Sequence, residues 1–198
     1  SAVEAIGKIP DAYFQAVGSG TGAIAAWDNN LRLIEDGSYS NTKMKIFVAQ
    51  NKPFTLLYDS WKAGRRCLAD LDPDLGRHQA ESILAKVLSN RKPPYSLAGG
   101  LFDALKDSNG DAFLASNDDI IYWILQFRNL EGFDILPAPA CAVKALSQAV
   151  SEGTVKKDEL VMLNVTGGGI LSSMSKGYQL KDPDLVLSPN LPADEIIA

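Results

Sequence analysis

The chain has few of the residues that build metal clusters and hydrolytic triads. Its 198 residues include two cysteines, Cys67 and Cys141, and one histidine, His78. The cysteines stand far apart with no second Cys or His at metal-ligand spacing, so we expect no metal site and two buried thiols. A single histidine leaves a Ser-His-Asp triad and a His-rich metal site without support. We therefore expect His78 to be structural or at the surface.

Long apolar runs and an excess of positive charge are also missing. No run approaches the roughly 18 apolar residues that a bilayer span needs, and no signal-peptide pattern opens the chain. The formal net charge of −5 disfavours binding to nucleic acid or to an anionic membrane. A content of 46% hydrophobic and 22% charged residues is typical of a globular protein. We expect a reducing, cytoplasmic location and no nucleic-acid or membrane partner.

Short apolar runs alternate with amphipathic segments along the chain. The pattern predicts strands at residues 13–17, 43–49, 111–115 and 160–165. It predicts helices at residues 22–34, 53–61, 99–106, 116–132 and 140–150. Such alternation indicates an α/β fold, a parallel sheet with helices on both faces.

Other segments give weaker signals. Residues 72–76 are expected to form a loop, residues 79–88 a helix and residues 133–136 an extended piece. The tail beyond Ser172 is expected to be a polar loop, since it contains Pro183, Pro189 and Pro192.

A glycine-rich run joins the first predicted strand to the following helix. It comprises Gly18, Ser19, Gly20, Thr21 and Gly22. The start of a helix offers unpaired N–H groups and a positive dipole end, which favour an anion. Glycines let the backbone close on that anion, and the two hydroxyls add donors. The run predicts a phosphate-binding cup, with a tight turn that binds nothing as the alternative.

The same run also fits the dinucleotide pattern G-x-G-x-x-A through Gly18, Gly20 and Ala23. That fold expects an acidic residue about 20 positions later, at the end of the second strand. The second predicted strand ends instead in Gln50 and Asn51. A nicotinamide-dinucleotide-binding oxidoreductase domain remains an alternative. A Walker P-loop is excluded, because no Lys-Ser/Thr pair follows the glycines.

A second glycine cluster, Thr166 to Gly169, follows the last predicted strand. In a parallel sheet it would leave the same carboxyl edge as the first loop, where ligands bind. The two loops could then bracket one ligand. A flexible connector is the alternative.

Residues 14–27 (FQAVGSGTGAIAAW) resemble the phosphate loop and following helix of threonine synthases and related pyridoxal-phosphate enzymes of the tryptophan-synthase-β type. Residues 45–51, 132–145 and 160–169 are similar to further segments of that family, in the family's order. The resemblance implies the cofactor pyridoxal 5′-phosphate, a small phosphoamino-acid substrate and a homo-oligomer. It implies that residues 18–22 hold the cofactor phosphate and that Thr166 hydrogen-bonds the pyridine nitrogen.

Within that family the chain is similar to cysteate synthases. This implies exchange of the phosphate of O-phosphoserine for sulfite, on the route to coenzyme M. Threonine synthases, which act on O-phosphohomoserine, are the alternative, but residues 136–140 (LPAPA) depart from their usual Glu-Pro-x-Ser-Ala. Arg65 and Arg66 are candidates for the substrate phosphate, or a solvated surface pair. An interaction or regulatory domain without a ligand is a further alternative.

Enzymes of this family attach the cofactor to a lysine that lies near an asparagine. None of the thirteen lysines here has that setting. We therefore expect residues 1–198 to be the C-terminal part of the cofactor-binding large domain, without the Schiff-base lysine and the small domain. No catalytic residue is assigned in this chain, and the chain alone is expected to be inactive.

Overall fold

The computed structural model describes residues 2–179, 181–184 and 186. Its centre is one four-stranded sheet in the order β3-β2-β1-β4, and every strand pair in it is parallel. The strands are β1 (Ala12–Ala16), β2 (Lys45–Asn51), β3 (Asp111–Ala115) and β4 (Val161–Leu163). All four strands lie where the sequence predicts them, although β4 is shorter than the predicted run.

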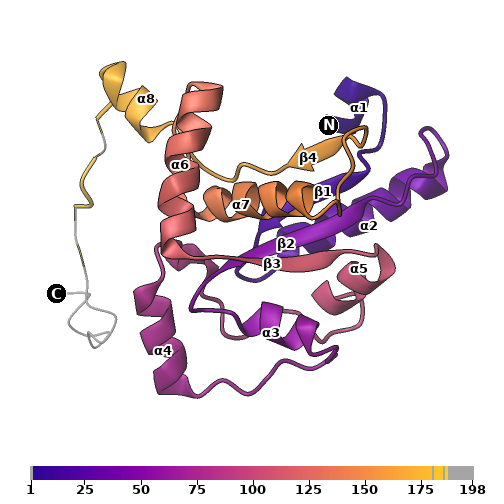
Figure 1. The fold of residues 1–198 in the computed structure, drawn as a ribbon, viewed down its shortest axis with the longest axis horizontal. Coiled ribbons are helices and arrows are strands. Elements are labelled where there is room, and N and C mark those ends of the chain that lie inside the picture. Colours follow the sequence, from indigo (N-terminus) through magenta and orange to yellow (C-terminus); the bar gives the residue numbers. More distant parts are fainter. Residues whose placement is uncertain (1, 180, 185, 187–198) are drawn as a thin grey trace.

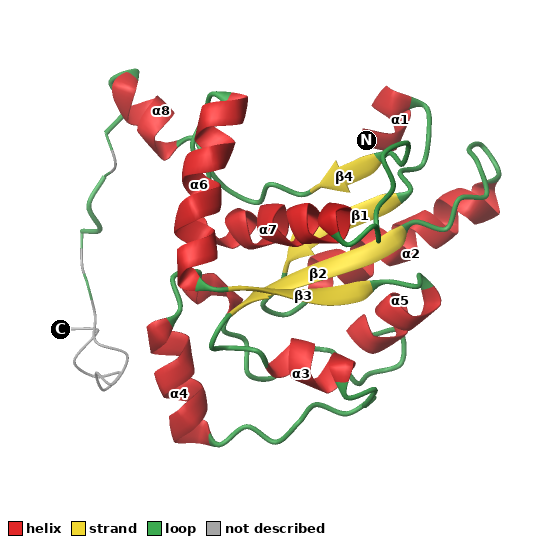
Figure 2. Cartoon of the chain, viewed as in Figure 1, coloured by secondary structure: helices red, strands yellow, loops and turns green. Residues whose placement is uncertain are grey.

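Helices cover both faces of the sheet, which confirms the predicted α/β fold (Figures 1 and 2). One face packs against α6 (Asn117–Glu131) and α7 (Pro137–Ser151); the other packs against α2 (Thr21–Asp36), α3 (Leu56–Lys62) and α5 (Leu101–Asp107). Side chains alternate along a strand. On β1, Phe14 therefore faces α7 and stacks on Phe47 with ring centroids 4.7 Å apart, whereas Tyr13 faces α2.

The helix starts follow from local hydrogen-bonding chemistry. Ser116 and Asp119 form a reciprocal capping box at the start of α6, as their spacing predicts. The predicted loop at residues 72–76 is wrong, because α4 (Pro73–Ser82) begins there. The Asp72 carboxylate accepts from the backbone N–H groups of Asp74 and Leu75, and proline suits the first helical position.

The predicted helix at residues 79–88 is also partly wrong. Helix α4 ends at Ser82, and only a single 3₁₀ turn, η1 (Lys86–Leu88), follows. Two short helices, α1 (Ala2–Ile6) and α8 (Ile170–Ser175), have no counterpart in the predicted pattern. The predicted polar loop beyond Ser172 therefore begins inside α8. Pro189 and Pro192 lie outside the described residues.

The burial predicted for the two cysteines and the histidine is confirmed only in part. Cys141 is buried, but Cys67 is exposed, so the expectation of two buried thiols is wrong for Cys67. His78 is exposed on α4, as expected. Across the described part of the chain, the helices are too short or too polar to cross a membrane.

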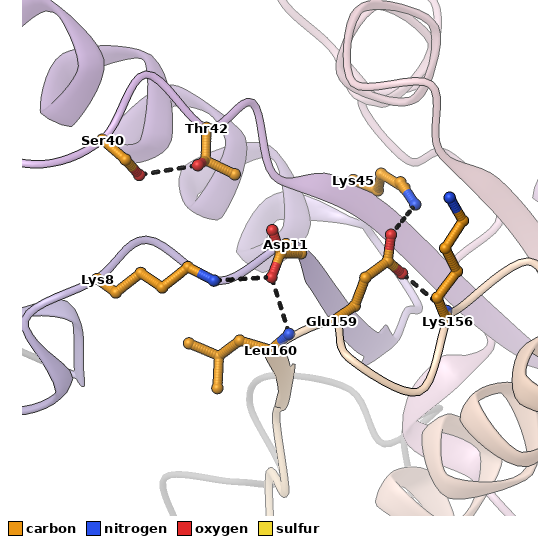
Figure 3. A network of polar contacts seen from close by, with 8 residues as sticks. All are labelled: Lys8, Asp11, Ser40, Thr42, Lys45, Lys156, Glu159 and Leu160. Carbon is orange, nitrogen blue, oxygen red and sulfur yellow. Dashed lines mark hydrogen bonds and ion pairs between the residues drawn. The ribbon is translucent and has the colours of Figure 1, made fainter.

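A polar network joins the amino ends of three strands (Figure 3). The Asp11 carboxylate accepts from the backbone N–H of Leu160 at 2.8 Å and from Lys8 Nζ at 3.2 Å. Lys45 Nζ at the start of β2 donates to Glu159 at 2.7 Å. The network joins the strands at the amino edge of the sheet. Both glycine clusters follow the carboxyl ends of strands and therefore lie at the opposite edge.

Candidate cofactor site

The first glycine loop fills the junction between β1 and α2. Gly20, the residue before the helix, has a left-handed φ of 81°, which glycine adopts without strain. A Cβ on Gly20 would lie 2.8 Å from Leu101 Cδ2, and one on Gly18 would lie 2.8 Å from the carbonyl oxygen of Val87. Both positions therefore require glycine, because a side chain at either would push the loop away from Leu101 or from η1.

The hydroxyls of this loop gather at the start of α2. Ser19 Oγ lies 2.9 Å from Thr21 Oγ1 and accepts from the Thr21 backbone N–H at 3.3 Å. Thr21 and Gly22 are exposed, and Ser19 is half-buried. Gly20 has no side chain to cap the helix, so apart from the Thr21 N–H, which donates to Ser19, the first-turn N–H groups are left for a ligand. This arrangement suits a phosphate, which accepts several hydrogen bonds at a helix start.

The second glycine cluster leaves the same edge of the sheet. Strands β1 and β4 are parallel neighbours, and the Asn164 backbone N–H donates to the Phe14 carbonyl at 2.9 Å. Because the two strands run in the same direction, Thr166 follows β4 at the same edge of the sheet as the glycine loop, and it is exposed there. The structure thus brings both predicted loops to one side of the sheet.

Residues 134–136 hold this cluster in place. Ile135 forms an antiparallel bridge with Gly168, and the Leu136 N–H donates to the Gly167 carbonyl at 3.0 Å. The Gly169 N–H donates to the Asp134 carbonyl at 2.8 Å. Backbone contacts at three successive glycines make the cluster an ordered turn, which argues against the flexible connector.

A third segment at this edge was missed by the sequence analysis. Asn51 is fully buried; its Nδ2 donates to the Ala115 carbonyl and to Asn117 Oδ1, both at 3.1 Å. Its Oδ1 accepts from the Ala85 N–H at 3.0 Å. These bonds hold η1 across the carboxyl ends of the strands, where the Val87 carbonyl faces Gly18. The available signal was the two asparagines, one that ends β2 and one that begins α6.

The residues that end β2 serve the fold. Gln50 is buried, and its Oε1 accepts from the Leu57 and Tyr58 N–H groups at 2.9 and 3.0 Å, at the start of α3. Gln50 and Asn51 therefore fill the place where a dinucleotide fold needs a carboxylate for the ribose.

Arg66 is engaged at the surface. Its guanidinium pairs with both carboxylate oxygens of Asp103, at 2.6 and 2.7 Å, and lies 5.5 Å from the Phe102 ring centroid. This bidentate pair agrees with the solvated-surface interpretation of Arg66.

Residues 1–184 match the family model described as pyridoxal-phosphate dependent enzyme. The chain belongs to this family. Membership confirms the predicted cofactor, pyridoxal 5′-phosphate, and removes the basis for the dinucleotide alternative. The glycine loop and the start of α2, which no side chain caps, fit the phosphate of that cofactor.

Cysteate synthases are among the proteins that this chain is similar to. That of Methanosarcina acetivorans is 42% identical over 194 residues, covering 96% of this chain and 47% of that protein. That of Methanocella paludicola is 48% identical over 164 residues, covering 82% of this chain and 38% of that protein. The chain spans about half the length of the curated relatives it matches, or less.

Solved structures share the fold. A threonine deaminase matches with a TM-score of 0.56 at 16% identity, covering 84% of this chain and 52% of that one. Serine racemase from Dictyostelium discoideum matches with a TM-score of 0.53 at 16% identity, covering 82% of this chain and 45% of that one. At this identity the likeness concerns the fold alone.

Proposed function

We propose that residues 1–198 form the C-terminal part of the cofactor-binding domain of a cysteate synthase. The whole enzyme would replace the phosphate of O-phosphoserine with sulfite: the bond from Cβ to the phosphate oxygen breaks, and a bond from Cβ to sulfur forms. The relatives named cysteate synthase, at 42% and 48% identity, are the observation that carries this proposal. The lysine that binds the cofactor would come from outside this chain.

The chain's own residues would bind and orient the cofactor. Residues 18–22 would hold its phosphate through backbone N–H groups of the α2 start and the hydroxyls of Ser19 and Thr21. Thr166 would donate a hydrogen bond to the pyridine nitrogen. A neutral partner suits replacement chemistry, which does not need a fully protonated ring. When bound, the cofactor supplies an electron sink for negative charge on the substrate.

Leu136 supports cysteate synthase over threonine synthase. Its Cδ1 lies 2.9 Å from the position that a Cβ on Gly167 would take, next to Thr166. An apolar side chain stands here where threonine synthases usually carry glutamate. This favours a different substrate from theirs, in line with the named relatives.

The phosphate cup is tested by binding, without catalysis. The probe is pyridoxine 5′-phosphate, which lacks the aldehyde and so forms no Schiff base with surface lysines. We expect Gly20→Val to weaken its binding by about 10- to 100-fold, because a side chain at this positive φ would clash with Leu101 and displace the donors that hold the phosphate. The affinity is measured by fluorescence titration of the full-length protein that contains this chain.

Gly37→Val is the matched control. Gly37 also has a positive φ, 71°, at the other end of α2, and a Cβ there would meet nothing within 4 Å. Equal affinity of both variants for the probe would remove the cup assignment. Turnover of the gene product with O-phosphoserine and sulfite, against O-phosphohomoserine, then separates the two substrates.

A further inference from the structure

A chain of side-chain hydrogen bonds links β4 to β1. Asn164 Nδ2 donates to Tyr13 Oη at 2.7 Å, and Tyr13 Oη donates to Gln15 Oε1 at 2.7 Å. Tyr13 is only 5% exposed, whereas Gln15 and Asn164 are half-buried. Tyr13 and Gln15 are two residues apart on β1, so both point to the face covered by α2. We call these three residues the relay.

Each end of the relay reaches one half of the candidate site. A Cβ on Gly22 would lie 2.5 Å from Gln15 Nε2, so the Gln15 amide lies directly against the first turn of α2. At the other end, Asn164 stands two residues before Thr166, and its backbone N–H is fixed to the Phe14 carbonyl at 2.9 Å. The relay therefore spans from the phosphate cup to the strand that delivers Thr166.

We propose that Tyr13 is a positioning residue of the cofactor site, whose hydroxyl sets the distance between the phosphate cup and Thr166. The inference rests on the proposed function and adds a residue that touches no cofactor atom. A bound pyridoxal phosphate needs both contacts at once, one at each end of the molecule. A change in their spacing weakens one of them.

The Tyr13 hydroxyl suits this task because it both accepts and donates. Burial raises the pKa of Tyr13 above its ordinary value of 10.0, against the opposing effect of the Asn164 amide. The phenol therefore keeps the proton that it donates to Gln15 through the neutral pH range. Phenylalanine would fill nearly the same space but would join neither amide.

The test is the affinity of Tyr13→Phe for pyridoxine 5′-phosphate. We expect binding about 3- to 10-fold weaker than wild type, because the hydroxyl's hydrogen bonds to Asn164 and Gln15 are both lost and the spacing of the site relaxes. We also expect altered fluorescence of the bound ring, since its nitrogen contact moves. Thermal unfolding of the same samples separates affinity from stability.

Tyr95→Phe is the matched control. Tyr95 belongs to the same apolar cluster, is fully buried, and donates its hydroxyl hydrogen to the Arg65 carbonyl at 2.9 Å. Its loss should lower stability and leave the affinity for the probe unchanged. Equal affinities of Tyr13→Phe, Tyr95→Phe and wild type would overturn the inference.

Asn164→Ala gives a second, milder test, because Asn164 is half-buried at the end of an edge strand. It should weaken binding as Tyr13→Phe does, and the double variant should lose little more, since the relay acts as one unit. Additive losses would contradict the relay. If Gly20→Val loses the probe while the relay variants keep wild-type affinity, the inference is wrong and the proposed function stands. If the wild-type protein itself does not bind the probe, both are wrong.

Discussion

The two thiols of the chain have opposite surroundings. Cys141 lies on α7 in the apolar cluster, with no exposed surface, and burial raises its pKa to about 12. Cys67 is exposed, in the irregular segment between α3 and α4. A single cysteine shows no periodic pattern, so its burial must be inferred from the element around it. The sequence predicts a helix around Cys141 but no element around Cys67.

We predict that a thiol reagent such as DTNB labels one cysteine per folded chain. The thiolate is the reactive form, and Cys141 is both inaccessible and protonated at neutral pH. Cys67→Ser should abolish rapid labelling of the folded chain. Unfolding that variant in denaturant should then allow one thiol, Cys141, to react. Rapid labelling of two thiols in the folded wild type would contradict the burial of Cys141.

The strands were predictable because local signals bounded them. Polar or glycine-containing turns flank β1, β2 and β3, and most of the buried side chains of these strands are apolar. Helix α4 was not predictable by the same means, since Asp72-Pro73 is typical of a turn as well as of a helix start. Packing decides it: Leu71 and Ala80 contact a separate cluster of Phe54, Leu56 and Ile83.

The candidate site was predictable where backbone chemistry defines it and not where distant side chains do. The glycine cup follows from its glycines alone. The position of η1 depends on Asn51 and Asn117, residues 66 positions apart that meet only in the folded chain. The relay has the same character, since Asn164 and Tyr13 are 151 positions apart.

We predict that Asn51→Ala destabilises the fold by about 2–3 kcal/mol, because the buried Ala85 N–H and neighbouring carbonyls lose a partner. The free energy of unfolding from urea titration measures the loss. Hydrogen exchange at the Ala85 amide should also become faster, as η1 loses its attachment to β2. Asn29→Ala, at an exposed position of α2, is the control and should change stability little. A similar small effect for both variants would contradict the structural role of Asn51.

The two edges of the sheet differ in the residues that they carry. The carboxyl edge carries glycine turns, open backbone N–H groups and no ion pair within residues 18–22 or 166–169. The amino edge is joined by charged side chains from β2 and from the segments that lead into β1 and β4. Charged side chains therefore stabilise the amino edge directly.

The carboxylates of the amino edge predict one part of how stability depends on pH. A hydrogen bond from the Leu160 N–H lowers the pKa of Asp11 below 3.8, and one from Lys45 lowers the pKa of Glu159 below 4.5. Because both pKa values are lower in the folded chain than in the unfolded one, these carboxylates stabilise the fold at neutral pH. That contribution begins to fall below about pH 4.5 and is lost as the pH drops through the folded pKa values.

Glu159→Gln isolates one of these groups. The variant should be less stable than wild type at pH 7. The difference should shrink from about pH 4.5 towards pH 3, because the unfolded chain takes up a proton on Glu159 at a higher pH than the folded chain, which keeps the ion pair with Lys45. Urea midpoints at both pH values measure the difference. Glu35→Gln, at an exposed position of α2, should keep the wild-type midpoint at each pH. A Glu159→Gln deficit that stays constant from pH 7 to pH 3 would mean that the amide disturbs packing and that the carboxylate charge contributes nothing.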